Sequence, residues 1–276
     1  MRGRAFMGLL ALAGAVGCGW IAPLHDRDPD GQSQTDPQDT TSQPQDAGVT
    51  HDVLVEAEAG DVRDAAPPFC GTNAGALFCD DFDDGGVGDE WSGTDVVPGG
   101  NLALDVDVDA SPSRALHASV GLKATLPHAF LFKDLADGPR NVTCSFDVFR
   151  DTQGDDISAA LVYAFELKNG NRYWRLAFTL QAGKLSIDEF RDTYTTHLPK
   201  TSDGTVPNRQ SVHFDVSVVF TPAPRLEVRV DDKVVVGTSS IDPNLDAGTL
   251  RSTIGLGFTG GPMAAWSMRY DNFICR

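Results

Sequence analysis

The chain has 276 residues, of which 41% are hydrophobic, enough apolar side chain for one large folded domain or two small ones. Its formal net charge is −17, and an acidic surface repels phosphate backbones, so a nucleic-acid partner is not expected. No window of about 18 apolar residues is present, so no membrane-spanning segment is expected either.

The first 18 residues have the pattern of an export signal. Arg2 and Arg4 precede an apolar stretch from Ala5 to Val16, which is too short to span a bilayer but typical of a signal-peptide core. The stretch ends in Ala15-Val16-Gly17-Cys18, which resembles the bacterial lipobox, although that motif usually has Leu in place of Ala15. The resemblance implies export, a diacylglycerol on Cys18, and an outer-membrane or cell-surface location. Ordinary secretion with cleavage nearby is the alternative.

Residues 19–66 are predicted to be a disordered linker. From Asp26 to Ala66 the chain is rich in Asp, Gln, Thr, Ser and Pro and has almost no aromatic residues. Such a segment cannot bury enough apolar surface to offset the entropy lost on ordering. The acidic excess continues beyond it, because residues 67–276 contain 28 acidic and 18 basic side chains.

Five cysteines occur, and if Cys18 carries lipid, Cys70, Cys79, Cys144 and Cys275 remain. An even number in an exported chain predicts two disulfides, for which three pairings are open. We favour Cys70 with Cys79, which closes a small loop, and Cys144 with Cys275, which would tie the last strand to an inner one. No close cysteine pair has the spacing of a zinc site.

From Phe69 to the C-terminus, apolar residues alternate with polar ones, which is typical of strands with one buried face. No stretch of ten residues shows a helical stripe. The expected strands lie within residues 102–108, 116–126, 142–148, 157–167, 174–180, 185–187, 212–220, 226–230, 234–236, 253–258 and 266–274. This pattern predicts an all-β fold of two packed antiparallel sheets.

Short turns separate several of these strands. Asn169-Gly170 lies between two alternating runs and is the strongest hairpin signal, because both residues tolerate a positive φ. Ala182-Gly183 and Asp231-Asp232 are expected to turn two further hairpins.

Three segments, taken in order, resemble concanavalin A-like (laminin G-like) jelly rolls. Residues 77–83, with Trp91 after them, are similar to the opening strand of that family. Residues 225–233 are similar to its strand hairpin, with Asp232 where glycine is usual, and residues 270–273 are similar to its closing strand. The resemblance implies a two-sheet antiparallel jelly-roll sandwich over residues 67–276.

This family includes sugar-binding modules, glucanases, polysaccharide lyases and protein-binding modules, so the fold does not decide the function. Glucanases of the fold use two carboxylates on one face of a strand, whereas Asp188 and Glu189 are adjacent and should point to opposite faces. Since no catalytic motif is found, we expect a membrane-anchored binding module of the cell envelope that recognises a polysaccharide or other glycan. The alternatives are a non-catalytic protein-interaction domain, and a polysaccharide lyase or glycosidase with an unrecognised site.

The ligand-binding candidates come from the strand after Asn169-Gly170. If Trp174 and its alternate neighbours face the core, Tyr173 and Arg175 face outward. Sugar sites combine an aromatic ring with polar groups, which these two side chains supply. Asp188 and Arg191 are further candidates on a neighbouring strand. An ordinary solvated sheet face is the alternative.

A structural Ca²⁺ ion is also implied by the resemblance. Several members of the family bind Ca²⁺ through an Asp of the closing strand and oxygens near the opening strand. Asp271 matches the closing-strand position, and Asp83 could lie nearby. Carboxylates and backbone carbonyls suit Ca²⁺, but a simple hydrogen-bonded Asp271 is the alternative.

Overall fold

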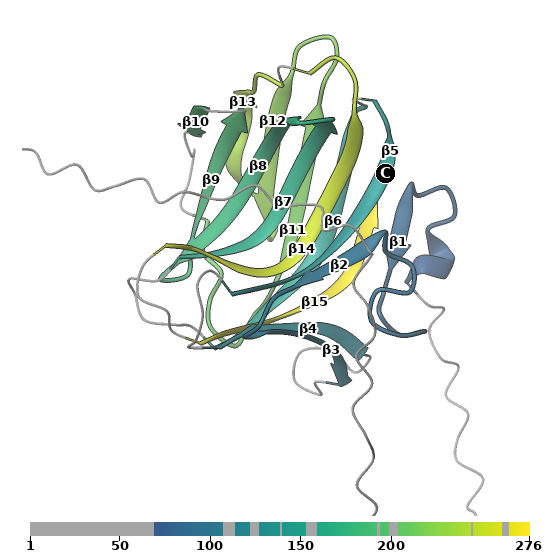
Figure 1. Cartoon of the computed structure of the whole chain (residues 1–276), viewed down its shortest axis with the longest axis vertical. Helices are drawn as coiled ribbons and strands as arrows, with labels where there is room; N and C mark the ends of the chain where they lie inside the picture. Colours follow the sequence, from purple (N-terminus) through teal and green to yellow (C-terminus); the bar gives the residue numbers. More distant parts are fainter. Residues whose placement is uncertain are drawn as a thin grey trace, which may run out of the picture. The chain divides into compact units, whose positions relative to one another are not determined.

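The computed structural model of the chain describes residues 69–106, 114–121, 127–138, 140–152, 159–191, 194–198, 204–243, 245–260 and 265–276 (Figure 1). The predicted signal peptide, Cys18 and the predicted linker lie outside the described residues. The described helical element is a 3₁₀ turn, η1 (Cys70–Thr72). None of the helical structure that is described is long or apolar enough to cross a membrane.

Two antiparallel sheets form a sandwich, which confirms the predicted fold class (Figure 1). Sheet A has the order β13-β12-β11-β6-β15-β4-β3, with β1 also paired to β15. Its strands are β1 (Phe78–Asp80), β3 (Gly100–Val106), β4 (Arg114–Val120), β6 (Val142–Thr152), β11 (Ser211–Val219), β12 (Arg225–Val230), β13 (Lys233–Ser240) and β15 (Trp266–Cys275).

Sheet B has the order β10-β9-β8-β7-β14-β5-β2. Its strands are β2 (Gly93–Val96), β5 (His128–Asp137), β7 (Ala159–Asn169), β8 (Arg172–Gln181), β9 (Lys184–Arg191), β10 (Tyr194–His197) and β14 (Thr249–Gly260). The central strands β7 and β14 are therefore brought together from distant parts of the chain.

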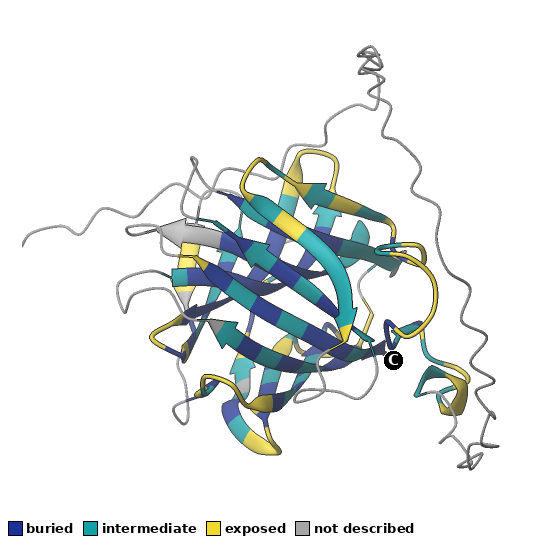
Figure 2. Cartoon of the chain, turned by 90° about the horizontal axis from the view of Figure 1, so that it is seen from below, coloured by how far each residue is buried: buried dark blue, intermediate teal, exposed yellow. Residues whose placement is uncertain are grey.

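The alternation in the sequence matches the burial of the strands. In β11 every second residue is buried, from Val212 to Val218, and the residues between them are partly exposed. The same banding of buried and intermediate residues is visible along the strands in Figure 2. One face of each such strand faces the core between the sheets.

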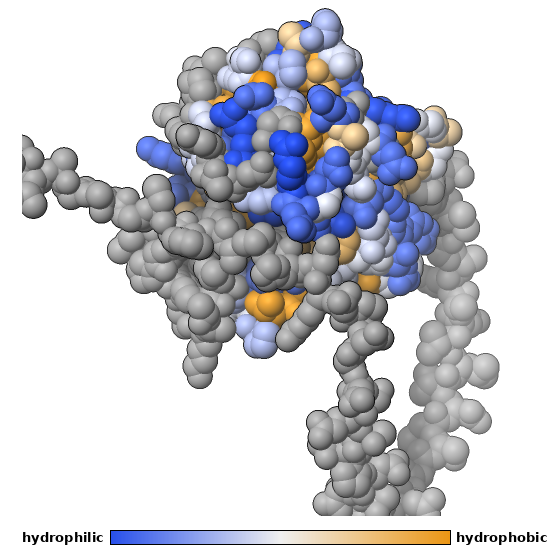
Figure 3. Space-filling view, turned by 45° about the horizontal axis from the view of Figure 1, so that its top comes forward, coloured by the Kyte–Doolittle hydropathy of each residue, from blue (hydrophilic) through white to orange (hydrophobic). Residues whose placement is uncertain are grey.

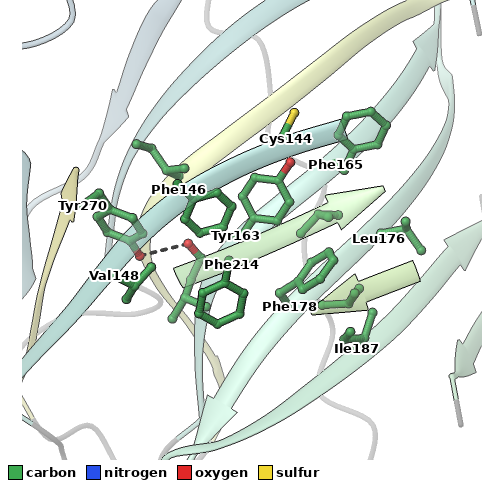
Figure 4. Close-up of a cluster of buried hydrophobic side chains, with 14 of the residues drawn as sticks. Cys144, Phe146, Val148, Tyr163, Phe165, Leu176, Phe178, Ile187, Phe214 and Tyr270 are labelled. Carbon is green, nitrogen blue, oxygen red and sulfur yellow. Dashed lines mark hydrogen bonds between the residues drawn. The ribbon is translucent and has the colours of Figure 1, made fainter. Parts of the chain in front are cut away.

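Aromatic side chains fill the middle of the core (Figure 4). The Phe146 ring centroid lies 4.8 Å from that of Tyr163, in the opposite sheet, and 5.3 Å from that of Phe214. The hydroxyl of Tyr270, in sheet A, donates to the backbone carbonyls of Val162 (2.9 Å) and Gly255 (2.7 Å) in sheet B. A buried polar group thus links the two sheets directly beneath the centre of sheet B.

The three expected hairpin turns are present. Gly170 has a φ of 58°, Ala182 and Gly183 have φ of 50° and 78°, and Asp231 and Asp232 have φ of 49° and 61°. In the second and third hairpins, positive φ at both central residues matches the twist of a two-residue turn, and aspartate tolerates it better than most side chains. Asp232 can therefore occupy the position where glycine is usual. In the first, Asn169 pairs with Arg172, so the turn residues are Gly170 and Asn171, one position later than expected, and Gly170 alone of the two has a positive φ.

The structure contains disulfides between Cys70 and Cys79 and between Cys144 and Cys275, which are the two pairs favoured above. Cys144 and Cys275 lie directly opposite each other on β6 and β15. The second bridge therefore joins residues 131 positions apart in the chain.

Three strands of sheet B, β2, β5 and β10, were not expected from the sequence. In β5 the consecutive residues Ala129, Phe130 and Leu131 are all buried. A strand that is covered on both faces has no alternation, and a short apolar run of this kind does not identify a strand by its periodicity.

Candidate functional site

A row of charged side chains crosses the face of sheet B that is turned away from sheet A, which we call the outer face of sheet B. Asp134 of β5, Arg251 of β14, Glu166 of β7 and Arg175 of β8 are consecutive cross-strand neighbours. Their charges alternate in sign along the row, which we call the charged row. It crosses the four central strands of the sheet.

The charged row consists of two ion pairs. The Arg251 Nε and Nη2 atoms lie 2.7 and 3.2 Å from the two carboxylate oxygens of Asp134. The Arg175 Nε and Nη2 atoms lie 2.7 and 2.6 Å from Glu166 Oε2. Glu166 and Arg175 are each only 7% exposed. Since a buried ion pair contributes little net stability, such a pair is better explained by the positions in which it fixes its two side chains.

Each arginine of the charged row also lies over an aromatic ring. The guanidinium carbon of Arg251 is 4.1 Å from the centroid of Phe132, and that of Arg175 is 5.5 Å from the centroid of Tyr173. Both distances are within the range of cation–π attraction. Tyr173 and Phe132 are partly exposed, so an aromatic ring stands at each end of the row.

Next to the charged row is a strip of small side chains. Thr253, Ala164 and Ala177 are cross-strand neighbours on β14, β7 and β8, and the strip is bounded by Phe132 on one side and Asp188 on the other. No large side chain stands between Phe132 and Asp188 at this level of the sheet. Thr253, Ala164 and Ala177 are at most 5% exposed, so the strip lies low between the larger side chains that flank it, with hydrogen-bonding groups beside it. Figure 3 shows hydrophilic residues over much of the described surface that it displays.

Three of the four predicted ligand-binding residues share this face. Tyr173 and Arg175 lie on β8, and Asp188 lies opposite Ala177 on β9. Arg191 lies opposite Trp174, on the other face of sheet B, and its guanidinium pairs with Asp242. The structure therefore separates Arg191 from the other three candidates.

Glu189 also lies on that other face, as expected for a residue adjacent to Asp188. Glu189 is 3% exposed, and its Oε1 atom accepts hydrogen bonds of 2.7 Å from Trp174 Nε1 and from the backbone N–H of Asp242. Asp188 and Glu189 thus do not form a glycosidase carboxylate pair.

The predicted Ca²⁺ ligands are both engaged within the protein. Asp271 Oδ1 accepts from the backbone N–H of Asn272 at 2.8 Å, and Asp83 Oδ1 accepts from the backbone N–H of Arg114 at 3.0 Å. Over the described ranges, no group of three or more His, Cys, Asp or Glu residues is arranged to hold a metal ion. The Ca²⁺ site stays a prediction without structural support.

Glu166, Arg251, Asp134 and Phe132 were missed by the sequence analysis. Glu166 alone left a signal, because it is a charged residue in β7, whose other residues are almost all apolar and buried. Arg251 and Asp134 belong to β14 and β5, and their position beside Glu166 depends on pairing between distant strands.

Comparisons with known proteins show the fold. No family model and no curated protein matches the sequence. A glucuronan lyase from the fungus Trichoderma reesei superposes with a TM-score of 0.56 at 12% identity, over 72% of this chain and 94% of the lyase. The cellulose-induced protein Cip1 superposes with a TM-score of 0.55 at 16% identity, over 72% of this chain and 96% of Cip1. The alginate lyase vAL-1 from a Chlorella virus superposes with a TM-score of 0.52 at 12% identity, over 67% of this chain and 92% of the lyase.

Proposed function

We propose that this chain is a carbohydrate-binding protein that holds a polysaccharide on the outer face of sheet B. The observation that carries the proposal is the charged row with its two arginine-covered rings, set beside the strip of small side chains. Sugars are bound by aromatic platforms next to fixed polar groups, and both are present on this face.

Each residue has a distinct part in this proposal. Tyr173 and Phe132 offer ring faces for the C–H groups of a sugar. Arg175 and Arg251 are oriented by Glu166 and Asp134 and present their remaining N–H groups to hydroxyl or carboxylate oxygens. Asp188 accepts hydrogen bonds from sugar hydroxyls across the strip.

The class of polysaccharide to test first is one that contains uronic acids. Two of the superposed proteins are named as lyases of glucuronan and alginate. An arginine that is held by a buried carboxylate is a specific partner for a uronate carboxylate, because its planar donors match that group.

A lyase is the second candidate. β-Elimination needs a cation that neutralises the uronate carboxylate and a nearby group that takes the proton at the adjacent carbon and returns a proton to the departing glycosidic oxygen, as the C–O bond breaks and a C=C bond forms. Arg175 and Tyr173, which are stacked on the outer face, are side chains of these two types. A glycosidase is not favoured by the predicted pair, because Asp188 and Glu189 lie on opposite faces of β9.

The experiment is a binding screen of the full chain with product release followed in parallel. Alginate, polyglucuronate and neutral glucans are immobilised in gels, and retardation of the protein is measured. Reducing ends and the ultraviolet absorbance of unsaturated uronate ends are recorded in solution. Retardation without product supports the binding function, and unsaturated product establishes a lyase. If no polysaccharide retards the protein and none is degraded, the proposed carbohydrate function is wrong. A protein-interaction domain is then the favoured function.

We also propose that a lipid on Cys18 holds the protein at the outer membrane or cell surface, with residues 19–66 as a tether. The support is the order of signal core, lipobox-like residues and acidic polar segment in the sequence. Metabolic labelling with palmitate in a bacterial host should label the chain but not the Cys18→Ser variant. Labelling of both, or of neither, would contradict the anchor.

A further inference from the structure

Arg150 is a buried cation without a carboxylate. It lies near the end of β6, opposite Met268 of β15, and is 4% exposed. Its Nε and Nη1 atoms are buried and have no hydrogen-bond partner in the part of the chain that the structure describes. Burial lowers the pKa of its guanidinium. Because a buried charge is costly unless it is paired, the surroundings of Arg150 favour an anionic partner.

The guanidinium lies against the turn between β8 and β9. A Cβ atom placed on Gly183 would be 2.6 Å from Arg150 Nη1 and 3.0 Å from the carbonyl oxygen of Val206. The absence of a side chain at Gly183 therefore makes room for the arginine. Arg150 is enclosed by sheet A, by this turn of sheet B and by the segment around Val206.

Two further cations belong to the segments that contact Arg150. Lys184 follows Gly183 directly, and the backbone N–H of Arg209 donates to the Arg150 carbonyl at 2.8 Å. Both side chains are exposed, and neither forms an ion pair with any described residue. Three cations that have no ion pair among the described residues thus belong to neighbouring segments of a domain with 28 acidic and 18 basic side chains.

A fourth donor lies at this end of the core. Trp266 is two residues from Met268 on β15, which places it diagonally opposite Arg150 on the core side of the neighbouring strand. Its indole N–H is buried and, within the described ranges, has no hydrogen-bond acceptor. Arg150 and Trp266 thus both carry buried donors without an acceptor among the described residues.

We propose that Arg150, Lys184 and Arg209 form an oxyanion-binding site at this end of the sandwich. Its ligand is a carboxylate, sulfate or phosphate group, free or carried by a larger molecule. Arg150 supplies the buried guanidinium that fixes the anion, and Lys184 and Arg209 attract it from solvent. Its buried cation, Arg150, lies on the core side of sheet A, so the proposal does not depend on the carbohydrate function of the outer face of sheet B.

The site is tested by calorimetric titration of the full chain with sodium sulfate, phosphate and acetate, each against sodium chloride at equal ionic strength. We expect saturable binding of at least one oxyanion, and a rise in melting temperature that chloride does not reproduce. The Arg150→Met variant keeps the side-chain volume and removes the buried charge, so it should fold and lose the binding. The Lys184→Ala/Arg209→Ala variant should bind about tenfold more weakly, as expected for the loss of charged contacts.

The matched control is the Arg225→Ala/Lys233→Ala variant, which removes two exposed cations of the β12–β13 hairpin and so changes the net charge equally. Its oxyanion affinity should equal that of the unmodified chain. The proposal is overturned if no oxyanion binds saturably, if Arg150→Met binds as well as the unmodified chain, or if the two double variants weaken binding alike.

Discussion

Tyr270 carries the hydrogen bonds that join the two sheets through the core. Its hydroxyl serves two backbone carbonyls that lie at irregularities in the pairing of β7 and β14, where neighbouring strands leave oxygens unpaired. Burial raises the pKa of this phenol, so it stays protonated and donates throughout the physiological range.

We predict that Tyr270→Phe lowers the free energy of unfolding by about 1–3 kcal/mol, because it leaves buried carbonyls without a donor. Urea denaturation measures the change. Tyr163→Phe is the matched control. The Tyr163 hydroxyl accepts a hydrogen bond from the hydroxyl of Ser252 at 3.0 Å and, among the described residues, is bonded to no backbone carbonyl. Its removal should therefore lower the free energy of unfolding by less than Tyr270→Phe does. Equal losses in the two variants would contradict the role given to Tyr270.

His213 lies on the outer surface of sheet A between two carboxylates. Its Nδ1 atom is 2.7 Å from Asp147 Oδ1, and its Nε2 atom is 3.6 Å from Asp215 Oδ1. The hydrogen bond to Asp147 raises the pKa of His213 above its ordinary value of 6.5. The folded state therefore binds this proton more tightly than the unfolded state does.

This linkage predicts that His213 stabilises the protein fully below pH 6.5 and that its contribution is lost as the pH rises through the raised pKa. The difference in unfolding free energy between the unmodified chain and His213→Gln should shrink over that interval. Denaturation at a series of pH values measures it, and Asp147→Asn should remove the same dependence. A difference that is constant with pH would show that the proton is not bound more tightly in the folded state.

At the scale of elements, the pairing of β14 with β5 requires glycine at position 255. Gly255 has a φ of 127°, and a Cβ atom there would lie 2.1 Å from the carbonyl oxygen of Ala129. Backbone conformation and contact both exclude a side chain, so the two strands approach closely beneath the outer face of sheet B.

Gly255→Ala should therefore destabilise the protein by about 3 kcal/mol or more, from backbone strain and displacement of β5 together. Gly170→Ala is the control, because Gly170 has a φ of 58° with nothing within 4 Å and should cost about 1–2 kcal/mol. Thermal and urea unfolding give both values. Equal losses of unfolding free energy in the two variants would contradict the close approach of β14 and β5 at Gly255.

The strands that could be predicted are those whose sequence alternates between apolar and polar residues, even where, as in β8, nearly every residue is buried. The hairpin of β7 and β8 has a turn signal at Asn169-Gly170 and alternation on β8, so the outward direction of Tyr173 and Arg175 followed from local sequence. Its register did not, because Asn169 pairs with Arg172 and the turn lies one residue later than expected. β5 could not be found this way, because burial on both faces removed its alternation. The rule that a strand has two unlike faces thus fails where neighbouring side chains bury consecutive residues, as at Ala129, Phe130 and Leu131.

At the scale of the molecule, the candidate site could be predicted only in part. Tyr173, Arg175 and Asp188 lie on adjacent hairpin strands, so parity along the chain placed them on one face. Arg191 is three residues after Asp188 on β9, so strand alternation puts the two side chains on opposite faces. The sequence alone was enough to separate them, although the prediction grouped them. The other half of the site comes from β14 and β5, which join β7 through contacts between residues distant in sequence, and no local pattern reports such pairing.

The most direct test of the carbohydrate function compares two rings that lie under arginines on opposite sides of the sandwich. Tyr173 lies under Arg175 on the outer face of sheet B, and Phe149 lies under Arg269 on sheet A, with 5.9 Å between guanidinium carbon and ring centroid. The measurement is the calorimetric Kd of the most strongly retarded polysaccharide for Tyr173→Ala and Phe149→Ala. We predict that Tyr173→Ala weakens binding about tenfold or more while Phe149→Ala leaves it unchanged. Unchanged affinity in Tyr173→Ala, or an equal loss in both variants, would contradict a binding site on the outer face of sheet B.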